Sequence, residues 1–341
     1  MAEKTFQIAV AFGVQSSAGT ADATIAALTG SLGETDGFVL GDPDSGVAGS
    51  GIEWAIAREL KEKADVSGSF TKQPSTFLSE QVETFSISFP LMGRGTSSPA
   101  ADADYKPAKG IDALILACGF AGAGGAGTSW SYTPAAAQII TAKLFVSGNY
   151  WVIKDCIAES AELTQPPGEV GILTVNLRGT IDSFGAVSFP TVNYGNQASL
   201  SAPTVKGVGH NWGISAASRS FTDATLSIAN EVEDIPDSNS STGKRSRQTA
   251  REISLAATIY TDSGDIDFER AELVRTTAPT DQQQWQVGTA GGSTANAYKI
   301  TLTNPEIRSL KPDRSGTSEV VEVELVAVET VANTEMELLF N

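Results

Sequence analysis

Residues 251–285 read REISLAATIYTDSGDIDFERAELVRTTAPTDQQQW, and the order of elements that they predict is repeated earlier in the chain. In residues 253–260, apolar side chains alternate with mostly polar ones, which is the period of a strand with one buried face. Residues 265–267 (DID) then offer an N-cap for a short helix over 268–275, which has acids early and an arginine late. We therefore expect a strand, a turn and a helix here.

A similar order precedes it in the first half of the chain. Residues 82–89 (VETFSISF) alternate as a strand, a loop rich in Gly, Ser, Pro and Asp follows, and 110–120 (GIDALILACGF) predicts a buried helix. The strand-like segments that follow each unit are 142–156 and 168–181 in the first half, and 297–310 and 318–329 in the second. We infer a diverged internal duplication, with units over 1–200 and 201–341, while chance similarity remains the alternative.

Length and composition predict a compact, strand-rich protein. The 341 residues suffice for two domains that each bury a core, and 41% of them are hydrophobic and only 18% charged. No run is long enough to span a membrane, and residues 1–13 contain an acid and too short an apolar segment for a signal peptide. The two cysteines, Cys118 and Cys156, suit reduced core residues better than a disulfide. We expect folding in the cytoplasm and no membrane partner.

The formal net charge of −17 is divided almost evenly between the two halves. Holding nucleic acid through its phosphates requires clustered Lys and Arg, so the charge argues against nucleic-acid binding. It suits a surface that DNA passes without sticking, because like charges repel. The simpler interpretation, that the protein is merely acidic and soluble, stays open.

The sequence offers little for catalysis. Its single histidine, His210, removes the usual Ser-His-Asp, Cys-His and multi-histidine metal sites. Three pairs of acids could imitate a glycosidase dyad, but the two acids of each pair lie only two residues apart, which is more typical of a solvated strand face. These pairs are Glu322/Glu324, Glu335/Glu337 and Asp265/Asp267. The segment EVEDIPDSN lacks the glycine and terminal glutamate of a calcium loop. We expect no catalytic site, no metal and no cofactor.

Several shorter segments carry local expectations. Residues 52–64 fit either a helix or a strand. The glycine-rich residues 121–128 (AGAGGAGT) predict a flexible link, since no Lys-Ser/Thr follows them as in a phosphate-binding loop. Residues 182–203 have no clear period and indicate a connector between the halves. Residues 238–248 (SNSSTGKRSRQ) predict a polar loop, preceded by the acidic segment 231–237.

Five stretches taken in order carry a resemblance to a known family. They are FGVQSSAGTADATI, AKLFVSGNYWVIKDCIAES, EVGILTVNLRGTID, EDIPDSNSSTGKRSRQ, and SEVVEVELVAV with the ending MELLFN. In pattern and order, over almost the whole chain, they are similar to the major tail tube proteins of long-tailed, non-contractile bacteriophages. That family has no active site, so the resemblance carries over no catalytic residue.

The resemblance implies a mainly β fold of two diverged tail-tube-type β-sandwich or β-barrel units, each with a short flanking helix, plus extended arms and loops. It implies rings whose sheets form a continuous inner barrel, stacked into a tube with other tail proteins at its ends. Genomic DNA would pass through without specific binding, in a virion tail assembled in the host cytoplasm. Family rings are hexamers of one unit or trimers of a duplicated unit, and the duplication favours the trimer.

Two segments are candidate contacts in such an assembly. The first is an inter-ring loop within residues 231–248, where the candidate residues are Asp234, Asp237, Lys244, Arg245 and Arg247. A surface loop without such a role is the alternative there. The second is the apolar tail, which we expect to bury against its own chain or a neighbour through Met336, Leu338, Leu339 and Phe340. Other functions that remain open are a carbohydrate-binding virion or surface protein and, less favoured, a glycan hydrolase.

Overall fold

The structure is a computed structural model. It describes residues 8–33, 38–39, 51–63, 75–94, 101–125, 128–146, 148–166, 168–193, 211–212, 221–236, 244–260, 282–287, 297–303, 305–315, 318–329 and 333–341.

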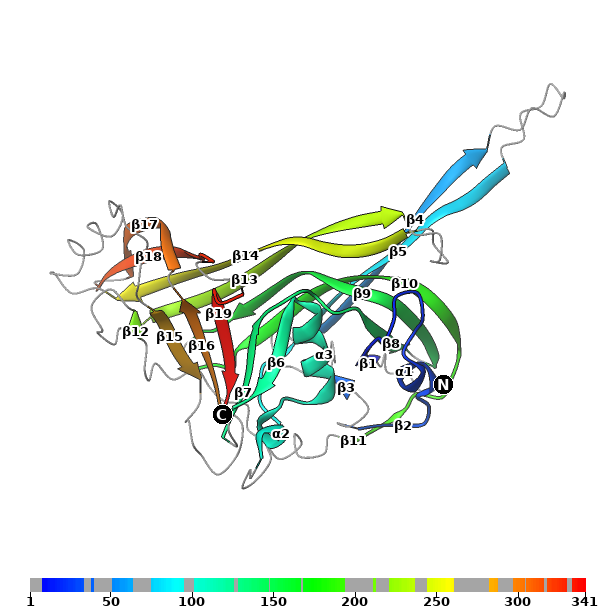
Figure 1. The fold of residues 1–341 in the computed structure, drawn as a ribbon, viewed down its shortest axis with the longest axis horizontal. Helices are drawn as coiled ribbons and strands as arrows, with labels where there is room; N and C mark the ends of the chain where they lie inside the picture. Colours follow the sequence, from blue (N-terminus) through cyan, green and yellow to red (C-terminus); the bar gives the residue numbers. More distant parts are fainter. Residues whose placement is uncertain are drawn as a thin grey trace, which may run out of the picture.

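A large antiparallel sheet forms one layer of the molecule (Figure 1). Its main path runs, from edge to edge, through β17 (Pro305–Ser315), β18 (Ser318–Ala327), β14 (Lys244–Tyr260), β13 (Phe221–Pro236), β9 (Asn149–Thr164), β10 (Ile172–Ala186), β5 (Ser75–Pro90) and β4 (Gly51–Lys63). The branch strands are β8 (Ile140–Val146), which pairs with β9, then β1 (Ile8–Val14) and β3 (Phe38–Val39). Among the described residues, the hairpins β13–β14 and β9–β10 have the longest strands, and β4–β5 follows them.

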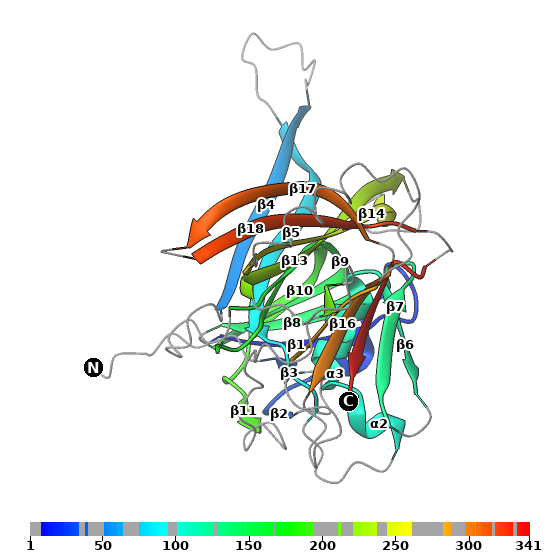
Figure 2. The same ribbon diagram turned by 90° about the vertical axis from the view of Figure 1, so that its left-hand side faces the viewer.

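A smaller antiparallel sheet and the longest helix lie on one side of the large sheet (Figures 1 and 2). The strands of the smaller sheet are, in order, β12 (Asn211–Trp212), β15 (Gln282–Val287), β16 (Tyr298–Thr303), β19 (Met336–Phe340), β7 (Trp130–Pro134) and β6 (Phe120–Gly124). The remaining elements are α1 (Ala23–Ala27), α2 (Asp102–Tyr105), α3 (Lys109–Ala117) and the parallel pair β2 (Ser31–Gly33) and β11 (Thr191–Asn193). Both antiparallel sheets take strands from both halves of the chain.

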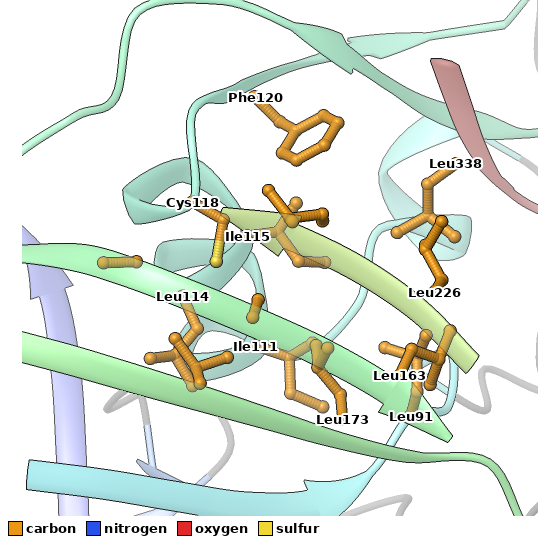
Figure 3. Close-up of a cluster of buried hydrophobic side chains, with 14 of the residues drawn as sticks. Leu91, Ile111, Leu114, Ile115, Cys118, Phe120, Leu163, Leu173, Leu226 and Leu338 are labelled. Carbon is orange, nitrogen blue, oxygen red and sulfur yellow. The ribbon is translucent and has the colours of Figure 1, made fainter. Parts of the chain in front are cut away.

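One hydrophobic cluster fills the space between the two sheets and α3 (Figure 3). Its labelled members in Figure 3 come from α3 and its C-terminal end, from the large sheet and its flanking segment, and from the smaller sheet: Ile111, Leu114, Ile115, Cys118, Leu91, Leu163, Leu173, Leu226, Phe120 and Leu338. The residues of α3 from Gly110 to Ala117 are all buried, and all are apolar except Asp112, which pairs with Lys106 and accepts a hydrogen bond from Tyr132. Residues from both halves therefore share one core.

The main strand and helix predictions are confirmed, and the protein is mainly β as expected. In β14, Ile253, Leu255, Ala257 and Ile259 are buried, as are Phe85, Ile87 and Phe89 in β5. The helix predicted over 110–120 is α3. The segment 52–64, which fitted a helix or a strand, is strand β4. The helix predicted over 268–275 lies outside the described residues.

Parts of three segments predicted as loop or connector are strands, and in the predicted connector 182–203 residues 182–186 belong to β10 and 191–193 form β11. Residues 121–124 are not a flexible link, because their backbone pairs with β7 as strand β6. The glycines here allow a close approach, since a Cβ on Gly122 would lie 2.7 Å from the Trp130 indole nitrogen. Residues 244–248 are likewise strand, since they pair with residues 232–236 of β13. In each case backbone pairing decides the structure, and side-chain composition gives no sign of it.

Candidate functional surfaces

The central part of the face of the large sheet that points away from the core is lined mostly by small polar side chains. One row crosses five neighbouring strands through Ser88, Thr174, Glu162, Ser227 and Ser254. Neighbours on this face hydrogen-bond each other, as the 2.8 Å contacts Ser88–Thr174 and Asn176–Ser160 show. In the described part of β5, β10, β9, β13 and β14, most large apolar side chains are buried in the core, whereas Phe184, Ile235 and Tyr260 near the strand ends are exposed. The central part of the outer face thus has short, hydrophilic side chains.

The basic residues at one side of this face are paired with acids. The guanidinium of Arg308 on β17 lies 2.8 Å from a Glu252 oxygen and 3.2 Å from a Glu324 oxygen. The ammonium of Lys311 lies 3.0 Å from a Glu322 oxygen. These hydrogen bonds raise the pKa of Arg308 and of Lys311 above their usual values. Because exposed ion pairs add little to stability, the main effect of the three glutamates is to neutralise the two cations.

The acid pairs considered for hydrolysis do not form an open dyad in the described residues. Glu322 and Glu324 share the outer face, and each faces a cation. Glu335 is buried and lies 2.5 Å from Arg251, whereas Glu337 is half-buried on β19. Asp265 and Asp267 lie outside the described residues, as does His210. Within the described ranges, no group of three or more His, Cys, Asp or Glu side chains is placed to hold a metal.

The eight-strand path consists of two halves with the same strand order. The first half reads β4–β5–β10–β9 and the second reads β13–β14–β18–β17. In each half a hairpin is followed in the sheet by the last strand that this half contributes to the path, and then by the strand that precedes that one in the chain. The halves meet where β9 pairs with β13, so β4 and β17 are the two outer edges of the path.

The registers of the two halves also match. The corresponding rows of cross-strand neighbours are Trp54–Phe85–Leu177–Ala158 in the first half and Leu226–Leu255–Leu325–Ile307 in the second. The hairpin of each half carries an extra residue six positions before Phe85 or Leu255, which is Ser79 or Thr249. The second pair of bulges, directly after Ala158 and Ile307, has Glu159 and Arg308 as its extra residues. Each half thus has two β-bulges, and both occupy equivalent places in the two halves.

The candidate inter-ring residues lie mostly on strands. Asp234 is on β13, where it forms an ion pair with Arg178 of β10 and accepts a hydrogen bond from Ser246 at 2.9 Å. Arg245 and Arg247 are exposed on β14, which Lys244 begins, and Asp237 lies outside the described residues. The structure therefore joins Asp234 to a cation of another strand of the same chain, while the two arginines face solvent.

The apolar tail is an interior strand of this chain. Met336, Leu338 and Phe340 are buried, because β19 is paired on one side with β16 and on the other with β7. Leu339 alternates with them and is half-buried on the other face. Met336, Leu338 and Phe340 thus bury against their own chain, which is one of the two expected arrangements, and the contact with a neighbouring subunit stays a prediction.

A buried polar cluster ties the β13–β14 hairpin to the end of α3. Arg251 donates to the carbonyl oxygens of Gly119 at 2.7 Å and Ala135 at 3.0 Å, in addition to its ion pair with Glu335. Next to it, Gln248 donates to Asn230 at 2.7 Å. This cluster was not predicted from the sequence. The pattern that could have predicted it is the alternation of β14, which places Arg251 on the same face as the buried residues, where a charged side chain requires a partner.

Comparison with known proteins names no family for this chain: no protein-family model matches it, and neither does any curated protein. Within the described residues, no helix is long and apolar enough to cross a membrane.

Proposed function

We propose that this protein is a structural subunit of a phage tail tube, which assembles with copies of itself into stacked rings through which genomic DNA passes. The observation that carries this proposal is the four-strand unit that occurs twice, with both bulges in equivalent places and the two units joined edge to edge. This repeat supports the internal duplication inferred from the sequence.

Repetition of an edge-to-edge contact leads from two units to a ring. The contact of β9 with β13 relates one unit to the next, and the same operation applied at the outer edges brings β4 of one copy to β17 of another. Contacts of this head-to-tail kind close into rings when the rotation permits. Closure also covers the two sheet edges, which otherwise leave unpaired backbone groups. Three duplicated chains then give a pseudo-sixfold ring, in preference to a hexamer.

The outer face of the large sheet is the proposed inner wall. Its central Ser, Thr and Asn side chains are short, and Arg308 and Lys311 are paired with glutamates, while Arg245 and Arg247 near one end of β14 are exposed. Together with the net charge of −17, this makes the wall repel phosphate and lets DNA move without being held.

One observation favours a second candidate, a carbohydrate-binding virion or surface protein that stays a small oligomer. The edge strand β17 carries Lys311 and Pro312, and lysine and proline are residues by which proteins keep sheet edges from pairing. In that protein the polar face would bind glycans, and the edges would stay open.

Negative-stain microscopy of the purified protein separates the two candidates. We expect rings or hollow tubes, and native mass measurement of the rings should give three chains of 35.5 kDa each. Six chains per ring would keep the tube and replace the trimer by the hexamer. Uniform small particles at high protein concentration, with no ring or tube, would contradict the proposed function.

A further inference from the structure

We propose that neighbouring copies join by pairing β4 of one with β17 of the next, in the register of the internal β9–β13 junction. This inference rests on the proposed ring and specifies its interface. It places Ala57 of one copy opposite Ser309 of the next, and Ala55 opposite Lys311. The partner of each edge is therefore a second copy of this chain.

The internal junction supplies the template. It pairs Leu226 with Leu163, and neighbouring pairs run from Thr225/Thr164 to Ala229/Ser160. The amide of Gln165 donates to the carbonyl of Ala224 at 2.8 Å, just beyond the end of this ladder. Because hydrogen-bonded and non-hydrogen-bonded pairs alternate along antiparallel strands, Leu163/Leu226 is a hydrogen-bonded pair and Ser160/Ala229 is not.

The matching bulges transfer this register to the outer edges. Leu226 of β13 has the place of Trp54 in β4, since each is paired with the strand residue six positions after the hairpin bulge. On the other edge, Leu163 of β9 has the place of Pro312 in β17, as their partners Leu173 and Val321 lie equally far from the second bulge. Trp54 of one copy therefore lies opposite Pro312 of the next.

Pro312 makes the junction between copies weaker than the junction within the chain. At the equivalent place, the amide of Leu163 points to β13, whereas proline has no N–H to donate. The outer ladder thus lacks one backbone hydrogen bond that the inner ladder has. The junction within the chain is therefore the more stable of the two, and the contact between copies depends more on protein concentration and on neighbouring rings.

Paired cysteines test the register directly. Ala57→Cys combined with Ser309→Cys places two cysteines at a non-hydrogen-bonded pair, where Cα atoms lie about 4.5 Å apart and a disulfide fits. Within one chain the same residues are separated by seven strand spacings, roughly 30 Å along the sheet at the usual interval. The native Cys118 and Cys156 do not interfere, because both are buried. The matched control, Ala57→Cys with Lys311→Cys, tests a register shifted by two residues.

After oxidation of assembled protein, non-reducing gels should show linked dimers and trimers for the Ala57/Ser309 variant and mostly monomer for the shifted control. Tubes that form without this cross-link, or that cross-link better in the control, would overturn the register and leave the proposed function standing. Absence of both rings and cross-links would overturn both. The two failures are therefore distinguishable.

Pro312→Ala tests the missing hydrogen bond. It restores an N–H at an exposed position of β17 without adding a large side chain. One net hydrogen bond of ordinary strength corresponds to roughly a fivefold tighter contact, so the concentration needed for assembly should fall by about that factor. Ser309→Ala, which restores no donor, is the control. An unchanged assembly concentration for Pro312→Ala would refute the role assigned to the proline.

Discussion

Removing the three glutamates that neutralise Arg308 and Lys311 should turn a surface that DNA does not bind into one that it does. The variant is Glu252→Gln, Glu322→Gln and Glu324→Gln. In the native protein the nitrogens of both cations lie 2.8 to 3.2 Å from these carboxylates, and the variant frees them. Both cationic side chains are exposed enough to reach a phosphate. The pairs are on the surface, so the variant should fold normally.

The expected magnitude follows from counterion release. Each phosphate contact contributes about −0.9 to the slope of log affinity against log salt, so two freed cations per chain give a slope near −2. Between 50 and 200 mM salt, affinity for a duplex should fall about tenfold for one chain. A ring of three copies presents six cations, and its affinity should fall by roughly a thousandfold over the same range.

Fluorescence anisotropy of a labelled DNA duplex measures this binding, with unassembled protein and with rings. Adding Arg308→Gln and Lys311→Gln to the triple variant should abolish the gain. The matched control is Glu162→Gln, Glu306→Gln and Asp223→Asn, which changes the net charge equally at exposed positions of the same face. If the control binds DNA as well as the triple variant, or if the triple variant does not bind, neutralisation by these glutamates is not what keeps DNA off the wall.

Three further outcomes concern the fold. Arg251→Met should lower the free energy of unfolding by about 3–5 kcal/mol in urea titrations, because it leaves Glu335 buried without its cation. The control Arg308→Met, at an exposed position, should change the free energy of unfolding little. Equal effects of the two variants would contradict the structural role of the Arg251–Glu335 cluster. Burial lowers the pKa of Lys143 from its usual 10.5. Just below pH 10.5 the unfolded chain therefore binds more protons than the folded chain, and the free energy of unfolding rises with pH there. Lys143→Met should remove this part of the rise, and an unchanged dependence of stability on pH would refute it. Burial raises the pKa of the Cys118 thiol to about 12 and also raises the pKa of the Cys156 thiol, so thiol reagents should label neither at pH 8 until the protein is unfolded. Rapid labelling of folded protein would show that the core is open.

The alternation of residues 253–260 and 82–89 was sufficient to predict which side chains of β14 and β5 face the core. The order of strand, loop and helix in the first half could also be predicted, because every residue of α3 from Gly110 to Ala117 except Asp112 is apolar. The same alternation left Arg251 on the buried face, but nothing nearby in the chain identifies Glu335 as its partner. A two-residue period determines the face of a strand, and it carries no information about which strand lies beside it.

The candidate surfaces therefore divide into two kinds. The small polar residues of the outer face were determined by the sequence itself, since each strand alternates independently of its neighbours. Only the tertiary structure decided that β9 pairs with β13, that Ser79 and Thr249 bulge at equivalent places, and that the tail β19 fills a gap between β16 and β7. Pairing between strands distant in the chain depends on backbone hydrogen bonds and on a shared core, and every residue except proline offers the same backbone donor and acceptor.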